Sequence, residues 1–354
     1  MTDCSRDRRD AVGQTRHGEV IRMAPRNALA PNPMSTIERR ADEARIAQVV
    51  ATPARWLVLG AFAIVYLVWG STYLAIRFAV ETLPPFSMAA ARFLVAGSAL
   101  YAYARVFGGA AAPTRTEWRT TAIVGVLLLV FGNGLVVWAE LTVPSGMAAL
   151  IVGIVPCCTV LVDWLRPTGT RPGARVVMGL ALGLAGLFVL IGPDAILGGD
   201  RIDYFGVAAL VVASFTWSVG SVYARHVPMP RSPVLATGME MLAASVGLAV
   251  LALLHGDFTT HAGAAPISLV SIAGWLYLVV FGSIVAFTAY VFLLQVSTPD
   301  RVSTYAYVNP VIAVLLGFAI AGEPLTTRMM FAAAVIVGGV VLITIAPKAR
   351  KPAD

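Results

Sequence analysis

The sequence predicts an all-α polytopic membrane protein, with ten transmembrane helices arranged as two inverted five-helix repeats. Three observations lead to this fold class. The chain is 58% hydrophobic and 13% charged, whereas a soluble domain typically carries about 25% charged residues. From residue 56 onward, apolar segments long enough to cross a bilayer as helices alternate with short polar loops. Finally, a stretch that begins at Trp69 recurs with the same spacing from Trp217.

The two ends of the chain differ in composition from the rest. Residues 1–55 are rich in Arg and have no sustained apolar period, which predicts a disordered cytosolic tail. Met34 opens a second possible translation start within this tail. The following apolar segment is long enough to span the membrane, so no signal cleavage is expected. Residues 347–354 form a short basic tail that is also predicted to be cytosolic.

The apolar segments divide into two sets of five. The first half covers residues 56–192 and the second covers residues 203–346. The loops between spans are short and rich in Pro, Gly, Asp and Thr, as connections usually are. The expected spans are 56–76, 86–107, 120–139, 144–165, 174–192, 203–224, 233–254, 269–294, 302–321 and 329–346.

The distribution of Arg and Lys predicts the orientation, because basic residues concentrate in cytoplasmic loops. With both termini in the cytosol, the opposite side receives only Arg77, Arg201 and Arg328. The cytosolic side receives the Arg-rich tail together with Arg105, Arg115, Arg119, Arg166, Arg171, Arg175, Arg225, Arg231, Arg301, Lys348, Arg350 and Lys351. This bias accounts for the net charge of +7, so no nucleic-acid partner is expected.

The repeat extends beyond the two Trp stretches. Phe131-Gly132 has a counterpart in Phe281-Gly282, and residues 141–156 resemble residues 296–310. Because each half has an odd number of spans, the second half enters the membrane inverted. Inverted repeats are typical of alternating-access carriers, whose site lies near the midplane between the repeats.

These residues carry a resemblance to a known family. The two five-span halves, WGSTYLAIRF from Trp69, ARFLVAG in the second span and Gly322-Glu323-Pro324 resemble the drug/metabolite transporter superfamily, and more narrowly its EamA family. The resemblance covers residues 56–346. It implies an inner-membrane carrier of small metabolites, often an exporter of amino acids. One departure is that Gly322-Glu323 has no partner in the first half, where residues 163–167 read DWLRP.

Several chemistries lack a signature in this sequence. No phosphate-binding loop of the ATPase type occurs, so transport is expected to run on a gradient or downhill. Gly179, Gly183 and Gly186 lie within one span, where small residues let helices pack closely. The four His are scattered and the three Cys have no metal-ligand spacing. No metal and no cofactor are therefore expected, and the expected partners are the lipid bilayer, a small-molecule substrate and protons as a candidate coupling ion.

Aromatic and polar residues inside the spans mark the expected cavity. Ser and Thr can instead bond to their own helix, and Trp and Tyr can lie in interfacial belts. Span nine is the most polar, and Asn309 beside Pro310 is expected to present a free amide near a broken backbone ladder. The candidate substrate-binding residues are Trp69, Tyr73, Asn133, Trp138, Trp217, Thr288, Tyr305, Tyr307 and Asn309.

Three acidic residues near span ends receive structural interpretations. Glu140 and Asp163 are expected to be solvated at the interface, where carboxylates are tolerated cheaply. Glu323 precedes Pro324 and the last span, so it is expected to cap and orient the last helix.

Two charged residues lie deeper, inside apolar spans. Arg92 and Glu240 occupy equivalent positions of the repeat, and charges at such depth normally face the bundle and have partners. Their expected depths differ by roughly 10 Å, which is too far for a direct ion pair. Two interpretations stay open. Each charge either binds polar groups of neighbouring spans and fixes the packing, or Arg92 attracts a substrate carboxylate while Glu240 attracts an amino group or a coupling proton.

The sequence therefore predicts a secondary transporter of the inner membrane, which moves a small amino-acid-like or otherwise polar metabolite outward by alternating access. The first alternative is a membrane-embedded enzyme, which would need a cluster of His, Asp, Glu or Ser at one face. The second alternative is a passive channel or a scaffold without transport, which would show no counterflow.

Overall fold

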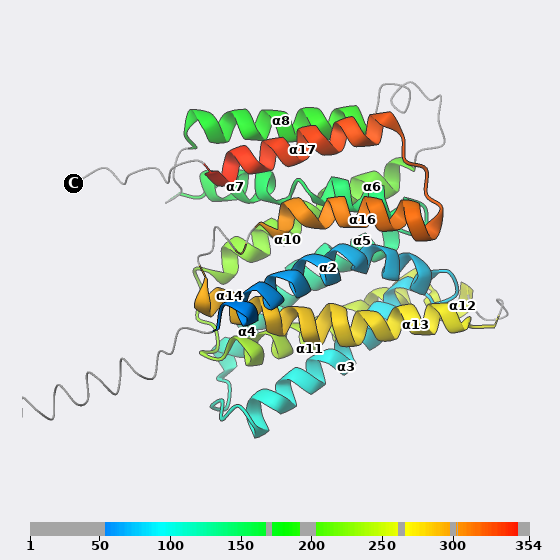
Figure 1. Ribbon diagram of the computed structural model, residues 1–354. Coiled ribbons are helices and arrows are strands. Elements are labelled where there is room, and N and C mark those ends of the chain that lie inside the picture. Colours follow the sequence, from blue (N-terminus) through cyan, green and yellow to red (C-terminus); the bar gives the residue numbers. More distant parts are fainter. Residues whose placement is uncertain are drawn as a thin grey trace, which may run out of the picture. The chain divides into compact units, whose positions relative to one another are not determined.

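The computed structural model describes residues 54–167, 172–191, 203–260, 266–297, 302 and 304–345, without the side chains at 191, 259–260, 294–295, 307 and 344–345. The two tails and the 193–202 loop lie outside this part of the chain. Throughout the described residues, the regular secondary structure is helical (Figure 1).

The first half of the chain forms helices over the five expected spans, and one of these helices contains a change in helix type. The third span is a continuous helix whose middle part has π geometry, and its start carries a capping box between Thr114 and Glu117. The elements are α2 (Arg55–Val80), α3 (Pro85–Val106), α4 (Arg115–Gly125), η1 (Val126–Asn133), α5 (Gly134–Ala139), α6 (Ser145–Val152), α7 (Val155–Leu165) and α8 (Ala174–Ile191).

The second half follows the same order, with a short extra helix after its second span. A second π segment occurs in the eighth span, the counterpart of the third. The elements are α10 (Tyr204–Ala224), α11 (Pro233–His255), α12 (Asp257–Thr260), α13 (Leu269–Tyr277), η2 (Leu278–Val285), α14 (Ala286–Val296), α16 (Tyr305–Ala321) and α17 (Thr327–Ile345).

The structure differs from the expected spans at the two prolines that the repeat aligns. The span expected over 144–165 is broken between α6 and α7, because Pro156 has no N–H to continue the helix and stands in the first turn of α7. Pro310, by contrast, lies inside α16, which runs on through it. Because Pro310 has no N–H to donate, the broken backbone ladder expected beside Asn309 is present, although the helix itself does not end there.

Six helices of the described chain are long and apolar enough to cross a membrane: Arg55–Val80, Arg115–Ala139, Ser145–Leu165, Tyr204–Ala224, Pro233–His255 and Leu269–Leu293. Three shorter apolar helices, Ala174–Leu190, Val308–Ala321 and Thr327–Ile343, accompany them. The tenth is α3, which carries Arg92 in place of an apolar residue. Many large apolar side chains are exposed, including Val106, Leu184 and Leu254, as expected of surfaces that contact lipid.

Helices of the two halves interleave in the bundle. In Figure 1, α8 lies beside α17 at one edge, whereas α2 and α16 lie between that pair and α3. The pairs in closest contact are α3 with α11, α8 with α17 and α2 with α16. Small residues allow the close approach: a Cβ at Gly179 would lie 2.6 Å from the Gly339 carbonyl oxygen, and one at Gly186 would lie 2.7 Å from Ile336 Cγ1. The helix-packing role predicted for these glycines is confirmed.

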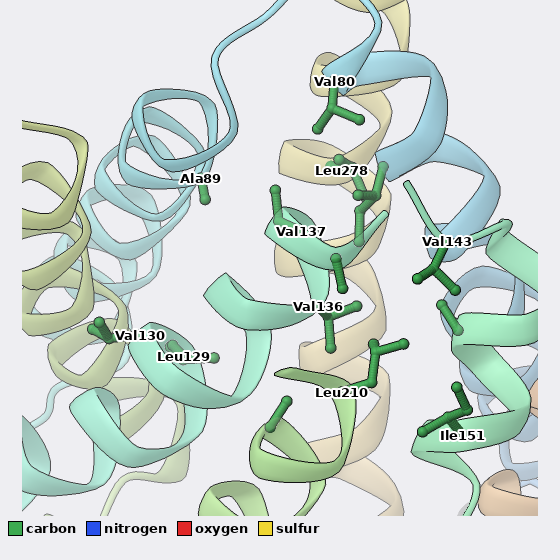
Figure 2. Packing of buried hydrophobic residues seen from close by; sticks show 14 of the residues in the cluster. Val80, Ala89, Leu129, Val130, Val136, Val137, Val143, Ile151, Leu210 and Leu278 are labelled. Carbon is green, nitrogen blue, oxygen red and sulfur yellow. The ribbon is translucent and has the colours of Figure 1, made fainter. Parts of the chain in front are cut away.

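One apolar core continues through both halves. Val136 and Val137 of α5 belong to the same cluster of buried residues as Val80 of α2 and Leu278 of η2 (Figure 2). Val137 and Leu278 are fully buried. The core therefore packs the two π-containing spans against the first helix.

Candidate functional site

An aromatic cluster surrounds Trp69 near the middle of α2. Its ring centroid lies 5.2 Å from that of Phe287, 5.2 Å from that of Tyr290 and 5.1 Å from that of Tyr305. Tyr290 and Tyr305 also meet edge to face at 6.0 Å. These rings come from α2, α14 and α16, so the first and second halves of the chain both contribute. We call these four residues the Trp69 cage.

The π segment η2 brings the backbone of Gly282 to the edge of the Trp69 cage. The indole nitrogen of Trp69 donates a hydrogen bond to the Gly282 carbonyl at 3.3 Å. A Cβ at Gly282 would lie 3.1 Å from Thr72 Cγ2 and 3.3 Å from Arg92 Nη2. Glycine at this position thus leaves room for both the first helix and the guanidinium of α3.

Arg92 is 3% exposed and reaches η2 from α3. Its Nε donates to the Ser283 hydroxyl at 2.8 Å, whereas Nη1 is buried without a hydrogen-bond partner. A buried, unpaired donor on a cation costs several kcal/mol unless an acceptor arrives. Arg92 therefore combines a structural contact with an open donor beside the Trp69 cage, which suits a carboxylate.

Glu240 lies on α11, which packs antiparallel to α3. A Cβ at Gly97 would be 2.9 Å from Met241 Cβ, and one at Gly238 would be 2.7 Å from Tyr101 N. This register sets Glu240 six residues from Arg92 along the helix pair, or about 9 Å. Within the described chain the two charges form no ion pair, and no hydrogen bond to the Glu240 carboxylate is found.

Glu240 nevertheless lies within electrostatic range of one residue of the Trp69 cage. Its carboxylate lies within electrostatic range of the Tyr290 hydroxyl, as does the Arg225 guanidinium. Tyr290 is itself a member of the cage. Arg92 and Glu240 thus approach the same aromatic cluster through different residues.

A second, weaker centre surrounds Trp217 at the equivalent position of the second half. A Cβ at Gly132 would lie 3.0 Å from the Trp217 ring, which mirrors the contact between Trp69 and Gly282. Beside Gly132, the side-chain oxygen of Asn133 is buried without a partner. Because α6 and α7 supply no aromatic residue equivalent to Tyr305, this centre forms no cage.

Span nine contributes differently from what its sequence predicts. Tyr305 belongs to the Trp69 cage. The free amide expected of Asn309 is not found: with its nitrogen facing the carbonyls, the buried carboxamide donates to Tyr305 O at 3.1 Å and to Tyr66 O at 3.3 Å. Asn309 therefore ties α16 to α2. Tyr307 lies in α16, but its side chain falls outside the described part of the structure.

Three other predicted residues lie away from the Trp69 cage. Thr288 is exposed, donates to the Ile284 carbonyl of its own helix at 2.7 Å, and lines an apolar groove with Trp56 and Phe292. Trp138 packs half-buried against the main core. Tyr73 also packs against the main core and lies within electrostatic range of Tyr305 on one side and Glu140 on the other.

The interpretation of Glu140 as solvated is wrong. Glu140 is 1% exposed, and both of its carboxylate oxygens lack a hydrogen-bond partner. The loop that follows α5 is covered by α2 and by the segment between α16 and α17. The burial of Glu140 could not be predicted from the sequence, because a carboxylate at the end of a span is usually solvated. Asp163 does fit the interpretation, being 39% exposed and paired with Arg166 at 3.1 Å.

The role expected of Glu323 is also wrong. Its carboxylate accepts hydrogen bonds from Ser145 N at 2.8 Å, Ser145 Oγ at 2.7 Å and Gly146 N at 2.9 Å. It therefore caps α6 of the first half, and Thr326 caps the last helix α17 instead, accepting from Met329 N at 3.2 Å. The reason is spatial: α16 ends beside the start of α6.

Comparison with known proteins identifies the group to which this chain belongs. The family model described as "EamA-like transporter family" matches residues 55–192 and again residues 204–345. The chain belongs to the EamA-like transporter family. Two EamA domains therefore make up the helical membrane-spanning part, and the chain is a membrane transporter rather than a membrane-embedded enzyme.

Individual EamA relatives cover most of this chain. An "uncharacterized inner membrane transporter YedA" of Escherichia coli K12 is 39% identical over 292 residues, or 81% of this chain and 90% of the relative. A "probable amino-acid metabolite efflux pump" of Salmonella typhimurium LT2 is 24% identical over 297 residues, or 82% of this chain and 95% of the relative. A solved crystal structure at 23% identity superposes with a TM-score of 0.56 over 82% of this chain and 96% of that chain, which supports the fold alone.

Proposed function

We propose that this EamA transporter exports a small zwitterionic metabolite, of the amino-acid type, across the inner membrane by alternating access. The observation that carries the proposal is the open donor of Arg92, whose Nη1 is buried without a partner. Nη2 of the same guanidinium lies near Gly282, whose carbonyl accepts from Trp69 of the cage. A carboxylate is the ligand that a guanidinium recognises best, and partial burial strengthens the interaction.

The proposed substrate class follows from three kinds of side chain at or near the Trp69 cage: a guanidinium, aromatic rings and a carboxylate. Arg92 would hold the carboxylate, the rings of Trp69 and Tyr305 would hold an apolar or aromatic side chain, and Glu240 would attract an ammonium group. Aromatic faces also favour cations. The name of the Salmonella relative, an amino-acid metabolite efflux pump, agrees with this class, and the Escherichia relative supports the inner membrane as location.

The proposed mechanism uses ten spans in two inverted five-helix halves. Its support is the interleaved packing of the halves, in which each main contact pairs a helix with one from the other half, and the equivalent positions of η1 and η2. The Trp69 cage draws on both halves, so rocking one against the other would change its access. The one-sided basic residues support both termini in the cytosol. Protons remain our candidate coupling ion.

Metabolite profiling of medium and cells, with and without overexpression, would identify the compound. The purified protein would then be tested for counterflow in liposomes, which a carrier shows and a channel does not. Loss of the guanidinium fork in Arg92→Lys should raise KM about tenfold or more, since a charged hydrogen bond contributes about 1.5–3 kcal/mol. The control Thr288→Val, outside the cage, should transport normally. Unchanged KM in Arg92→Lys would remove Arg92 from the site.

Glu240 has a separate test, because its role could be structural. Glu240→Gln keeps the size of the side chain and should express and insert normally, yet lose transport or its pH dependence. Both charges would be assigned to packing by two results together. Glu240→Gln would transport with the wild-type rate and pH profile, and Arg92→Ala would fail to accumulate.

A further inference from the structure

Glu140 is the most isolated acidic group in the described part of the chain. It follows the last residue of α5, is 1% exposed, and has no hydrogen bond to either oxygen. The residues three positions before and three after it in the chain, Val137 and Val143, are both buried. An ionised carboxylate without partners in such surroundings costs several kcal/mol, so this geometry favours the neutral acid.

The charged groups that face Glu140 cannot compensate a negative charge on it. Glu323, from the segment between α16 and α17, accepts three hydrogen bonds from Ser145 and Gly146 at the start of α6. Arg77 of α2 is engaged with that carboxylate at 3.7 Å. Tyr73, also of α2, is a neutral neighbour. In the loop that follows Glu140, the Thr142 hydroxyl donates to Asp203 at the start of α10.

Burial is thus the largest influence on Glu140, and the negative charge of Glu323 adds to it. Together they raise the pKa of the Glu140 carboxyl well above its ordinary value, and Arg77 opposes them only in part. The two acids differ because Glu323 accepts hydrogen bonds from the start of α6 and contacts Arg77 directly, whereas neither oxygen of Glu140 has a hydrogen-bond partner.

We infer that Glu140 is a proton-binding site: it carries a proton while the ends of α5, α6 and α16 are packed as in this structure, and it releases that proton when they separate. The inference rests on the proposed alternating-access function, which requires such a separation. Opening would bring water to the carboxyl and free Arg77 to pair with either acid. The reaction is the transfer of one proton between the carboxylic acid and water at the face predicted to be external.

The sign of the pH effect follows from linkage. A pKa that is higher in the packed state than in the open state makes low pH favour the packed state. That advantage is complete below the pKa of the water-exposed acid, about 4.3, and is lost as pH rises through the raised pKa. External acid should therefore slow opening at this face.

The test is infrared spectroscopy of the purified full chain in lipid, titrated from acid to alkaline pH. A carbonyl band of a protonated carboxyl group should persist at neutral pH in the wild type, disappear in Glu140→Gln and remain in Asp163→Asn. If the spectra of wild type and Glu140→Gln coincide at neutral pH, Glu140 is ionised there and the inference is wrong. A Glu140→Gln chain that fails to accumulate also counts against it, because a neutral isostere should fit where the acid is neutral.

A transport assay distinguishes a failure of the proton site from a failure of the proposed function. Wild-type efflux from proteoliposomes should fall as the pH on the external face is lowered, whereas Glu140→Gln should be insensitive to it. The infrared band needs no substrate, so a wrong substrate class would leave it intact. Efflux by the wild type without the infrared band would instead uphold the proposed function and overturn the proton site.

Discussion

Replacing Glu323 by Gln should destabilise the transporter through the start of α6. The carboxylate accepts three hydrogen bonds there, at 2.7–2.9 Å, from Ser145 and Gly146. The Gln carboxamide keeps one acceptor for Ser145 but turns an NH₂ group toward the Gly146 N–H, so one donor is left unpaired. The negative charge that favours a helix N-terminus is lost as well.

The magnitude follows from these contacts. Hydrogen bonds to charged groups contribute about 1.5–3 kcal/mol, and an unpaired buried donor costs about 1–3 kcal/mol. The charge at the helix start adds about 0.3–1 kcal/mol. Contact with Arg77 adds little, since that side chain is 38% exposed. We expect a total loss of about 2–4 kcal/mol, or about 4–8 °C in Tm at the shallow slope of large chains.

Thermal unfolding of the detergent-purified protein, followed by the loss of the monodisperse peak, measures this shift. Asp163→Asn is the matched control, because it removes an acid from an exposed pair within one helix and should shift Tm by about 1 °C or less. If Glu323→Gln moves Tm no more than this control, the cap does not hold α6 in place and the reasoning about this face of the protein is refuted.

Three further predictions concern packing, span nine and topology. Gly339→Val should lower accumulation strongly, because a Cβ there would lie 2.7 Å from the Gly179 carbonyl, whereas the adjacent Gly338→Val meets nothing within 4 Å and should be tolerated; equal accumulation of the two would contradict the packing. Asn309→Leu should lower transport while the chain stays inserted, because the link to the Tyr66 carbonyl is lost; normal counterflow would dismiss that role. A Cys at Gly198, in the loop predicted to be external, should react with an impermeant reagent in intact cells, whereas one at Phe107 should react only after lysis; the reverse pattern would invert the topology.

The sequence by itself determined the class of the protein. Composition and segment length reflect the solvent around each helix, so they predict which segments are helical. Some bounds differ: α2 ends at Val80 instead of 76, and the third span begins at Arg115 instead of 120. The duplicated Trp stretch likewise predicted the paired positions of Trp69 and Trp217, because a repeat copies local contacts such as that of each Trp with a glycine of the third or eighth span. The EamA resemblance, stated from these same residues, is confirmed by the family match.

The tertiary structure decided the partner and the depth of each polar group. Glu140 and Glu323 both stand at the ends of apolar segments, where the sequence predicted solvation for the first and a cap on the last helix for the second. Which one receives donors depends on a helix start 178 residues away along the chain. Asn309 likewise finds its acceptor on α2. Such contacts are set by how the halves interleave, and burial removes water as the alternative partner, so local pattern cannot predict which carboxylate is paired and which is left alone.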